Sequence, residues 1–171
     1  MGFFDKLFGS KKPAKPEAIS VSLAKGAVGA VASGRIEQTD AIPDPVFAGE
    51  AMGKTVAIWP DEGVVYAPVA GTVSASMPHA VGIAGDDGVE VLIHIGVDTV
   101  EMNGDGFTVW CEGNTHVTAG EPLVSFDRDK VKKAGHPDII MTIITNSDDY
   151  PALAKVAEGQ VKAGDTVITT A

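Results

Sequence analysis

The chain has 171 residues, of which 44% are hydrophobic and 21% charged, so it can bury a substantial core as one domain. Thirteen basic residues against 23 acidic ones give a formal net charge of −10, which argues against nucleic acid as a partner and favours a basic protein partner. No apolar run approaches the roughly 20 residues of a transmembrane helix, no secretory signal is recognisable, and the single cysteine, Cys111, predicts a reducing, cytoplasmic setting.

The N-terminal stretch differs from the rest of the chain. Residues 1–25 carry five lysines against two acidic residues, a net charge of +3, which leaves −13 for the remainder. The opening MGFFDKLFGS places its apolar side chains on one side of a helical turn, and KKPAKPE follows as a basic, proline-containing linker. Two interpretations stay open: residues 1–15 bind weakly to the anionic inner face of a membrane, or they form a disordered terminus. We therefore expect a tail at 1–18 and a single domain at 19–171.

From residue 19 onward, short runs rich in Val, Ile and Thr alternate with Gly, Asp, Asn and Pro, as in GVVYAPVAGTVSAS. This pattern predicts an all-β fold of short antiparallel strands, sandwich-like or barrel-like, with little helix. Only FDRDKVKKAG and SDDYPALAKVAEG are compatible with a turn or two of helix. Two internal repeats, THVTAGEPLVSF (115–126) with GQVKAGDTVITT (159–170) and SGRIEQ with AGTVSA, indicate duplicated hairpin motifs.

The segment GVEVLIHIGV, residues 88–97, places a histidine inside an apolar strand. Period-two alternation puts five β-branched residues on one face: Val89, Val91, Ile93, Ile95 and Val97. Leu92 and His94 fall on the opposite face. If HAVGIAG forms the neighbouring antiparallel strand around the acidic turn GDDG, pairing about residues 86–87 brings His79 opposite His94.

Such a histidine pair supports three interpretations. The rings pack in the core and bond to backbone carbonyls; they bind a metal, since paired imidazoles suit zinc, although no third and fourth ligands cluster nearby; or one is a nucleophile that the other supports electrostatically. The other histidines, His116 and His136, lie in polar turns, and we expect both to be solvent-exposed. Cys111 is expected to be a structural thiol that is at least partly buried.

Several longer motifs resemble one bacterial family. The segments DPVFAGEAMGKTVAIWP, VVYAPVAGTV and DDGVEVLIHIGVDTVEMNGDGFTV are similar to the IIA domain of the glucose family in the bacterial phosphoenolpyruvate-dependent sugar phosphotransferase system. The similarity continues through VTAGEPLVSFD and IIMTIITN and covers residues 28–147, and GFFDKLF resembles the amphipathic leader of free-standing members. The resemblance implies a phosphotransferase component that carries a phosphoryl group as phosphohistidine during sugar uptake.

The resemblance also implies roles for individual residues. His94 would accept the phosphoryl group from the phosphocarrier protein HPr and pass it to a cysteine on the IIB domain of a IIBC sugar permease. Its Nδ1–H would donate to the backbone carbonyl of Gly96, which fixes the tautomer. His79 would support the phosphoryl oxygens.

The rim of the site is implied in the same way. Asp44 and Asp98 correspond to acidic residues that flank the site in the family and suit arginines on HPr, and Val46 and Phe47 correspond to its apolar rim. One departure concerns GTVSASMPH, which is about two residues shorter than in most members and lacks the Thr that precedes the first histidine. The orientation of His79 is therefore less well defined than that of His94.

Partners and cofactors follow from the same resemblance. No cofactor is required for the transfer, and zinc would bind His79 and His94 only if a partner in a complex supplied a carboxylate. An alternative function, also known in the family, is a phosphorylation-switched regulator that docks on transporters or metabolic enzymes. The transported sugar stays open, because its specificity resides in the membrane IIC domain.

Overall fold

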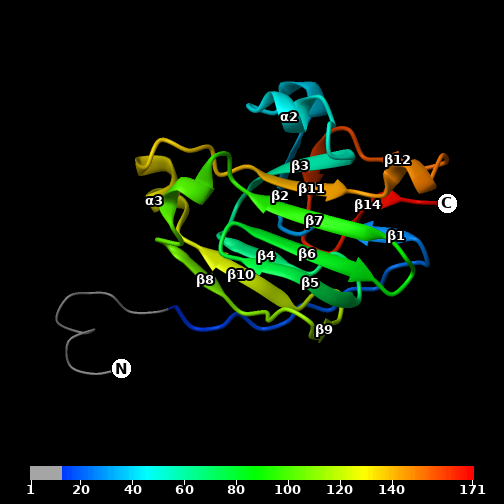
Figure 1. Cartoon of the computed structure of the whole chain (residues 1–171), viewed down its shortest axis with the longest axis horizontal. Coiled ribbons are helices and arrows are strands. Elements are labelled where there is room, and N and C mark those ends of the chain that lie inside the picture. The colour runs from blue at the N-terminus through cyan, green and yellow to red at the C-terminus, as the bar shows by residue number, and fades with distance from the viewer. Residues whose placement is uncertain (1–12) are drawn as a thin grey trace.

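Three antiparallel β-sheets enclose the core in a computed structural model that describes residues 13–171 (Figure 1). The largest sheet contains, in spatial order, β13 (Gly159–Val161), β2 (Gly34–Glu37), β3 (Lys54–Pro60), β11 (Ile140–Ile144), β7 (Glu90–Ile95), β6 (Ala80–Gly85), β5 (Gly71–Met77) and β9 (His116–Val117). The smaller sheets are β1 (Ala27–Gly29), β14 (Thr166–Thr169) and β12 (Ala154–Lys155), and β4 (Val64–Tyr66), β10 (Pro122–Phe126) and β8 (Phe107–Val109). The predicted all-β, antiparallel sandwich is confirmed.

The helical segments are short and lie in the connections: η1 (Thr39–Ala41), α2 (Pro45–Ala48), η2 (Thr99–Met102), α3 (Arg128–Lys133) and η3 (Ser147–Asp149). α3 is the helical turn expected within FDRDKVKKAG, whereas SDDYPALAKVAEG forms only η3 before β12 begins. Among residues 13–171, no helix has the length and apolar composition that crossing a membrane requires.

α2 was not anticipated, although DPVF carries a helix start signal. The Asp44 carboxylate accepts hydrogen bonds from the N–H groups of Val46 and Phe47, and proline occupies the first helical position. Such a cap contributes about 1 kcal/mol, whereas burying a phenylalanine side chain contributes roughly 1.5–3 kcal/mol. Packing of the buried Phe47 against the sheet therefore holds this four-residue helix more strongly than its cap does.

The chain enters the domain as an extended segment. Residues 13–24 form neither helix nor strand, and the N–H of Ile19 donates to the carbonyl of Gly120 at 3.0 Å. The predicted amphipathic, basic segment at 1–15 lies almost entirely outside the described residues. Its contact with a membrane and the division between residues 18 and 19 stay predictions.

The predicted repeats form equivalent turns. In each copy a glycine N–H donates to the carbonyl of an alanine that directly follows a strand, and that alanine's N–H donates to the carbonyl of the acidic residue after the glycine. The residues are Gly120, Ala67 and Glu121 in one copy and Gly164, Ala30 and Asp165 in the other, with N···O distances of 2.7 to 2.9 Å. Both glycines have φ of +93°, in the region that favours glycine. The structure thus contains the duplicated turn predicted from the first pair of repeats.

β7 separates two apolar clusters. Its burial alternates as the sequence predicts, and Val91, Ile93 and Ile95 face the main core between the sheets. A smaller cluster covers the other face, and we call it the outer cluster: Ile42, Phe47, Ala57, Val97, Ile139, Met141 and Ile143. The assignment of Val97 to the same face as Ile95 is wrong, because the positive φ of Gly96 ends the alternation.

Candidate functional site

His94 lies on the face of β7 that the outer cluster covers. Its cross-strand neighbours are Ala80 on β6 and Met141 on β11. Above it, the ring of Phe47 from α2 packs with a centroid distance of 5.0 Å and an interplanar angle of 46°. The imidazole is half-buried, so an apolar wall surrounds a ring that still reaches the surface.

A single hydrogen bond orients the His94 ring. Its Nδ1 lies 2.8 Å from the carbonyl oxygen of Gly96, which is the contact that the family resemblance implies. A carbonyl oxygen only accepts, so Nδ1 carries the proton and the neutral ring keeps a lone pair on Nε2. Within residues 13–171 the ring has no other hydrogen bond. Nε2 is therefore unprotonated and makes no hydrogen bond to the described residues.

The turn that presents the Gly96 carbonyl is itself fixed. Gly96 donates its N–H to the carbonyl of Ile139 at 2.8 Å, and Val97 donates to that of Pro137 at 3.1 Å. Gly96 has φ of +76°, and a side chain there would collide with the Thr99 methyl group and approach the Pro137 oxygen to 3.0 Å. Only glycine fits this position without strain.

Sequence reasoning missed the residues that clamp this turn. Besides the backbone of Pro137 and Ile139, the buried Thr99 donates its hydroxyl to the carbonyl of Ile95. A threonine directly after Asp98, where a helical turn begins, is a signal that could have indicated this role. The partners at 137 and 139 lie about 40 residues away and leave no such signal.

His79 meets His94 edge-on, although not through the predicted register. The ring centroids are 5.4 Å apart at 74°, and the carbonyl of His79 accepts from the N–H of Ile95 at 2.8 Å. Ala80, not His79, is opposite His94. The prediction assumed a hairpin centred between residues 86 and 87, whereas Gly85 pairs with Val89 around a three-residue loop. His79 itself lies in the tight turn between β5 and β6.

The surroundings keep both imidazoles neutral. Burial lowers the pKa of His94, and His79 lowers it further; the bond to Gly96 and the negative charges of Asp44 and Asp98 oppose this shift without cancelling it. Burial also lowers the pKa of His79. Within residues 13–171, the His79 ring has no hydrogen bond. Both rings are thus available to a ligand at neutral pH.

The predicted acidic and apolar residues surround the pair without bonding to it. Asp44 caps α2, 2.8 Å from the Val46 N–H, and Asp98 is exposed with φ of +59° at the start of η2. Val46 is 47% exposed, whereas Phe47 is buried. The site therefore has an apolar centre and a partly acidic edge.

Two further exposed apolar residues lie close to the site in the sequence and were not predicted. Val100 on η2 is 56% exposed, and Met77 at the end of β5, two residues before His79, is 42% exposed. Large apolar side chains in turns, as in DTV and SMP, are the signal that could have shown them. The exposed apolar surface around the histidines suits a protein partner.

The other candidate residues lie outside the site. His116 is exposed and 2.8 Å from Asp86, as expected of a polar turn. His136 is not exposed as predicted: its side chain is only 13% exposed and lies 3.9 Å from Glu101. The chain folds back after α3, where the N–H of His136 donates to the carbonyl of Val131. Cys111 is buried, and burial raises the pKa of its thiol, consistent with a structural role.

A metal ion would find only two ligands here. Across residues 13–171, no group of three or more His, Cys, Asp and Glu side chains has a metal-binding arrangement. A zinc ion on His79 and His94 would therefore need a further ligand from another molecule.

Comparison with known proteins places these features in one family. Residues 26–150 match the family described as phosphoenolpyruvate-dependent sugar phosphotransferase system, EIIA 1. The chain is 40% identical to the glucose-specific EIIA component of Halalkalibacterium halodurans, over 98% of this chain and 96% of that protein. It is 36% identical to the corresponding component of Staphylococcus aureus strain COL, over 96% of each.

Two further matches concern architecture. The glucose permease IIA structure from Mycoplasma capricolum superposes with a TM-score of 0.75 and 34% identity, covering 85% of this chain and 95% of that one. The β-glucoside-specific EIIBCA component of Bacillus subtilis is 44% identical over 68% of this chain, which corresponds to 20% of that protein. The same domain thus occurs alone and as part of a longer polypeptide.

Proposed function

Since this chain belongs to the EIIA 1 family of the phosphoenolpyruvate-dependent sugar phosphotransferase system, a family of phosphoryl carriers, we propose that His94 is its phosphoryl-carrying residue. His94 accepts the group from phosphorylated HPr and passes it to a cysteine on a IIB domain during sugar uptake. The observation that carries this proposal is the bond between Nδ1 of His94 and the Gly96 carbonyl, which leaves Nε2 as the free nucleophile.

The transfer is a displacement at phosphorus. The Nε2 lone pair of His94 forms a bond to phosphorus while the bond between phosphorus and HPr breaks, and that electron pair returns to HPr. Phosphoryl transfer asks for positioning and for stabilisation of the phosphoryl oxygens. The fixed ring supplies the first, and the lowered pKa of His94 keeps the lone pair available. No cofactor takes part in this step.

His79 supplies a donor for the phosphoryl oxygens. Its ring lies edge-on to that of His94 with a centroid distance of 5.4 Å, close enough for a ring N–H to donate to a phosphoryl group on Nε2 of His94. The apolar wall strengthens such a bond and excludes water. Asp44 and Asp98 repel the phosphate and so act on the partner, where they attract arginines of HPr. Val46 and Phe47 form the apolar contact.

The proposal also covers the partners of the protein and its location in the cell. HPr and the IIB domain of a IIBC permease dock in turn on this one face, and the protein acts in the cytoplasm. Residues 1–15 then make a weak contact with the anionic inner face of the membrane.

A second function is favoured by the change in charge at this face. Phosphorylation would add about −1.5 to −2 charges to a surface whose centre is two neutral imidazoles and whose edge exposes Val46 and Val100. A transporter or metabolic enzyme that docks on the apolar face would be released by that charge. This regulatory function needs only the modification, whereas the carrier needs onward transfer.

Onward transfer separates the two functions. Wild-type protein is phosphorylated with phosphoenolpyruvate, Enzyme I and HPr, freed of these proteins and mixed with a purified IIB domain, and both chains are weighed by intact-mass spectrometry at mildly alkaline pH. The carrier proposal predicts that the phosphoryl group moves to the IIB cysteine and not to a Cys→Ser variant of that domain. A phosphorylated protein that transfers nothing to any IIB domain contradicts the carrier function and leaves the regulatory one.

A further inference from the structure

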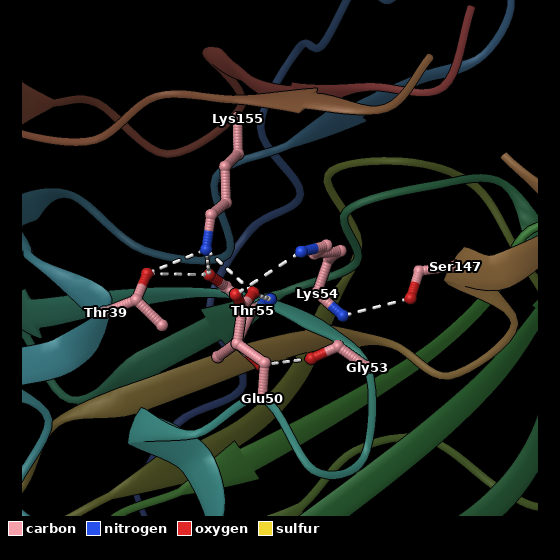
Figure 2. Close-up of polar contacts among 7 residues, drawn as sticks. All are labelled: Thr39, Glu50, Gly53, Lys54, Thr55, Ser147 and Lys155. Atoms are coloured by element: carbon pink, nitrogen blue, oxygen red, sulfur yellow. Dashed lines mark hydrogen bonds and ion pairs between the residues drawn. The ribbon is translucent and has the colours of Figure 1, made fainter. Parts of the chain in front are cut away.

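A second polar cluster lies beside α2 and has no part in the function proposed above. Lys155 extends from β12 and donates all three of its ammonium hydrogens, as Figure 2 shows. Its Nζ lies 2.7 Å from Oγ1 of Thr39, 2.8 Å from Oε2 of Glu50 and 2.9 Å from the carbonyl oxygen of Thr55. The Lys155 and Glu50 side chains are only 23% and 22% exposed.

These contacts join the two ends of the connection formed by residues 39–55, which we call the 39–55 excursion. Between β2 and β3 the chain leaves the sheet after Glu37 and returns at Lys54, so Thr39 and Thr55 lie close to the two ends of this connection. The residues between them include Asp44, Val46 and Phe47, the docking edge of the histidine site. Lys155, 100 residues further along the chain than Thr55, therefore holds both ends of the segment that carries this edge.

The link from Lys155 to His94 is continuous. The Glu50 carboxylate bonds to Lys155 and also accepts from the N–H of Thr55 at 2.8 Å. The Glu50 N–H donates to the carbonyl of Phe47 at 3.1 Å, and the Phe47 ring packs on His94. Two hydrogen-bonded contacts and one ring contact thus connect the Lys155 ammonium group to the His94 imidazole.

The segment needs this support because its own structure is strained. Glu50 has φ of +53°, a left-handed conformation that costs a non-glycine residue about 1 kcal/mol or more. Burial opposes ionisation of Glu50, but the bonds from Lys155 and Thr55 outweigh it and lower the pKa of the carboxyl group. The charged pair therefore persists at neutral pH and holds the strained turn.

We propose that Lys155 is a positioning residue for phosphoryl transfer: through Glu50 and Thr39 it holds the 39–55 excursion so that Asp44, Val46 and Phe47 are presented to the partner. This inference rests on the proposed function. Because the Gly96 carbonyl lies outside the excursion and still fixes the His94 ring by its hydrogen bond, loss of Lys155 weakens docking and leaves the chemical step nearly unchanged.

The test compares Lys155→Met with Lys155→Arg and with Lys130→Met. Lys130 is the matched control, since it forms a 2.9 Å ion pair with Asp105 but does not contact the excursion. The rate of His94 phosphorylation is measured against the concentration of phosphorylated HPr. If the docking-competent conformation falls to about a tenth of molecules in Lys155→Met, the half-saturating concentration rises about tenfold. The maximal rate stays close to that of wild type.

Amide hydrogen exchange gives a readout independent of HPr. The N–H groups of Val46 and Phe47, which bond to the Asp44 carboxylate, are expected to exchange faster in Lys155→Met. Lys130→Met keeps the wild-type values in both measurements, and Lys155→Arg recovers most of the loss because its guanidinium still donates. If Lys155→Met does not fold, Thr39→Val gives a smaller rise of about threefold. This variant removes the bond from Lys155 and the longer 3.5 Å bond from the Thr39 hydroxyl to the Thr55 carbonyl, but keeps the Lys155–Glu50 pair.

An unchanged half-saturating concentration in folded Lys155→Met, or in Thr39→Val where that variant replaces it, overturns the inference. An equal rise in Lys130→Met overturns it as well, because the effect would then follow from general loosening. If wild-type protein accepts no phosphoryl group, the proposed function fails separately. Exchange at Val46 and Phe47 then decides alone: faster exchange in Lys155→Met supports the anchor, and identical exchange contradicts it.

Discussion

The 39–55 excursion contacts two polar sites of different kinds: Lys155 with its three acceptors, which we call the Lys155 cluster, and the histidine pair. At the Lys155 cluster, every ammonium hydrogen has an acceptor and the charge is neutralised by Glu50. At the histidine pair, only the His94 ring makes a hydrogen bond within residues 13–171, and apolar contacts and a backbone turn hold the rings in place. A satisfied ion pair indicates architecture, whereas polar atoms fixed in position but left without partners indicate chemistry.

Removing the His79 ring tests the histidine pair and is expected to have the largest effect. His79→Ala is expected to slow onward transfer to a IIB domain roughly 100-fold, the order of magnitude for loss of one preorganised donor, while His94 still becomes phosphorylated. Single-turnover transfer from the phosphorylated variant measures the effect. Transfer at the wild-type rate would show that His79 does not stabilise the phosphoryl oxygens.

Removing the Lys155 ammonium group tests the site where every ammonium hydrogen has an acceptor. Lys155→Met leaves the largely buried Glu50 carboxylate with only the more distant Lys54 ammonium, 3.7 Å away, as a charged partner, and is expected to lower the free energy of unfolding by about 2 kcal/mol. Urea unfolding followed by fluorescence gives the midpoint and slope. Lys130→Met, which breaks a more exposed pair with Asp105, should cost much less than Lys155→Met. Equal losses in the two variants would remove the distinction between the clusters.

The reactive histidine should matter little for stability. His94→Gln gives up one hydrogen bond of a half-buried ring, so the free energy of unfolding is expected to change by about 1 kcal/mol or less. The same urea experiment measures it. A loss as large as that of Lys155→Met would mean that His94 is also a structural residue and that the contrast between the two sites is overstated.

Acidification produces the smallest and most selective effect. The lowered pKa of His94 means that the unfolded chain binds its proton first as pH falls, so stability drops between the ordinary histidine pKa and the lower value of the folded state. Phosphoryl acceptance should likewise persist below the ordinary histidine range. NMR titration of the His94 ring and the rate with phosphorylated HPr measure both. Protonation at or above the ordinary pKa would contradict the role of burial.

The histidine site could be predicted further than the Lys155 cluster for a physical reason. Period-two alternation in β7 placed His94 on its own face from local sequence alone, because a strand alternates whatever its neighbours are. The exact partner of His94 was missed by one residue, since the length of the loop at Asp86–Gly88 decides the register.

The features that could not be predicted from the sequence depend on long-range contacts. Lys155 meets Glu50 across 105 positions, and the Gly96 turn is clamped by the backbone at 137–139. Neither contact has a local pattern, because the sheet order brings β12 and β11 to these places. The family resemblance supplied the roles of Gly96 and Asp44, which alternation and composition did not contain.

The measurement that tests the central claim most directly is intact-mass spectrometry at neutral or mildly alkaline pH, where phosphohistidine survives. Wild type, His94→Gln and His79→Gln are each incubated with phosphoenolpyruvate, Enzyme I and HPr. We predict the mass of one added phosphoryl group on wild type and His79→Gln and none on His94→Gln. An unmodified wild type, with the same partners active on another IIA protein, or a modified His94→Gln, would contradict the assignment of His94 as the phosphoryl carrier.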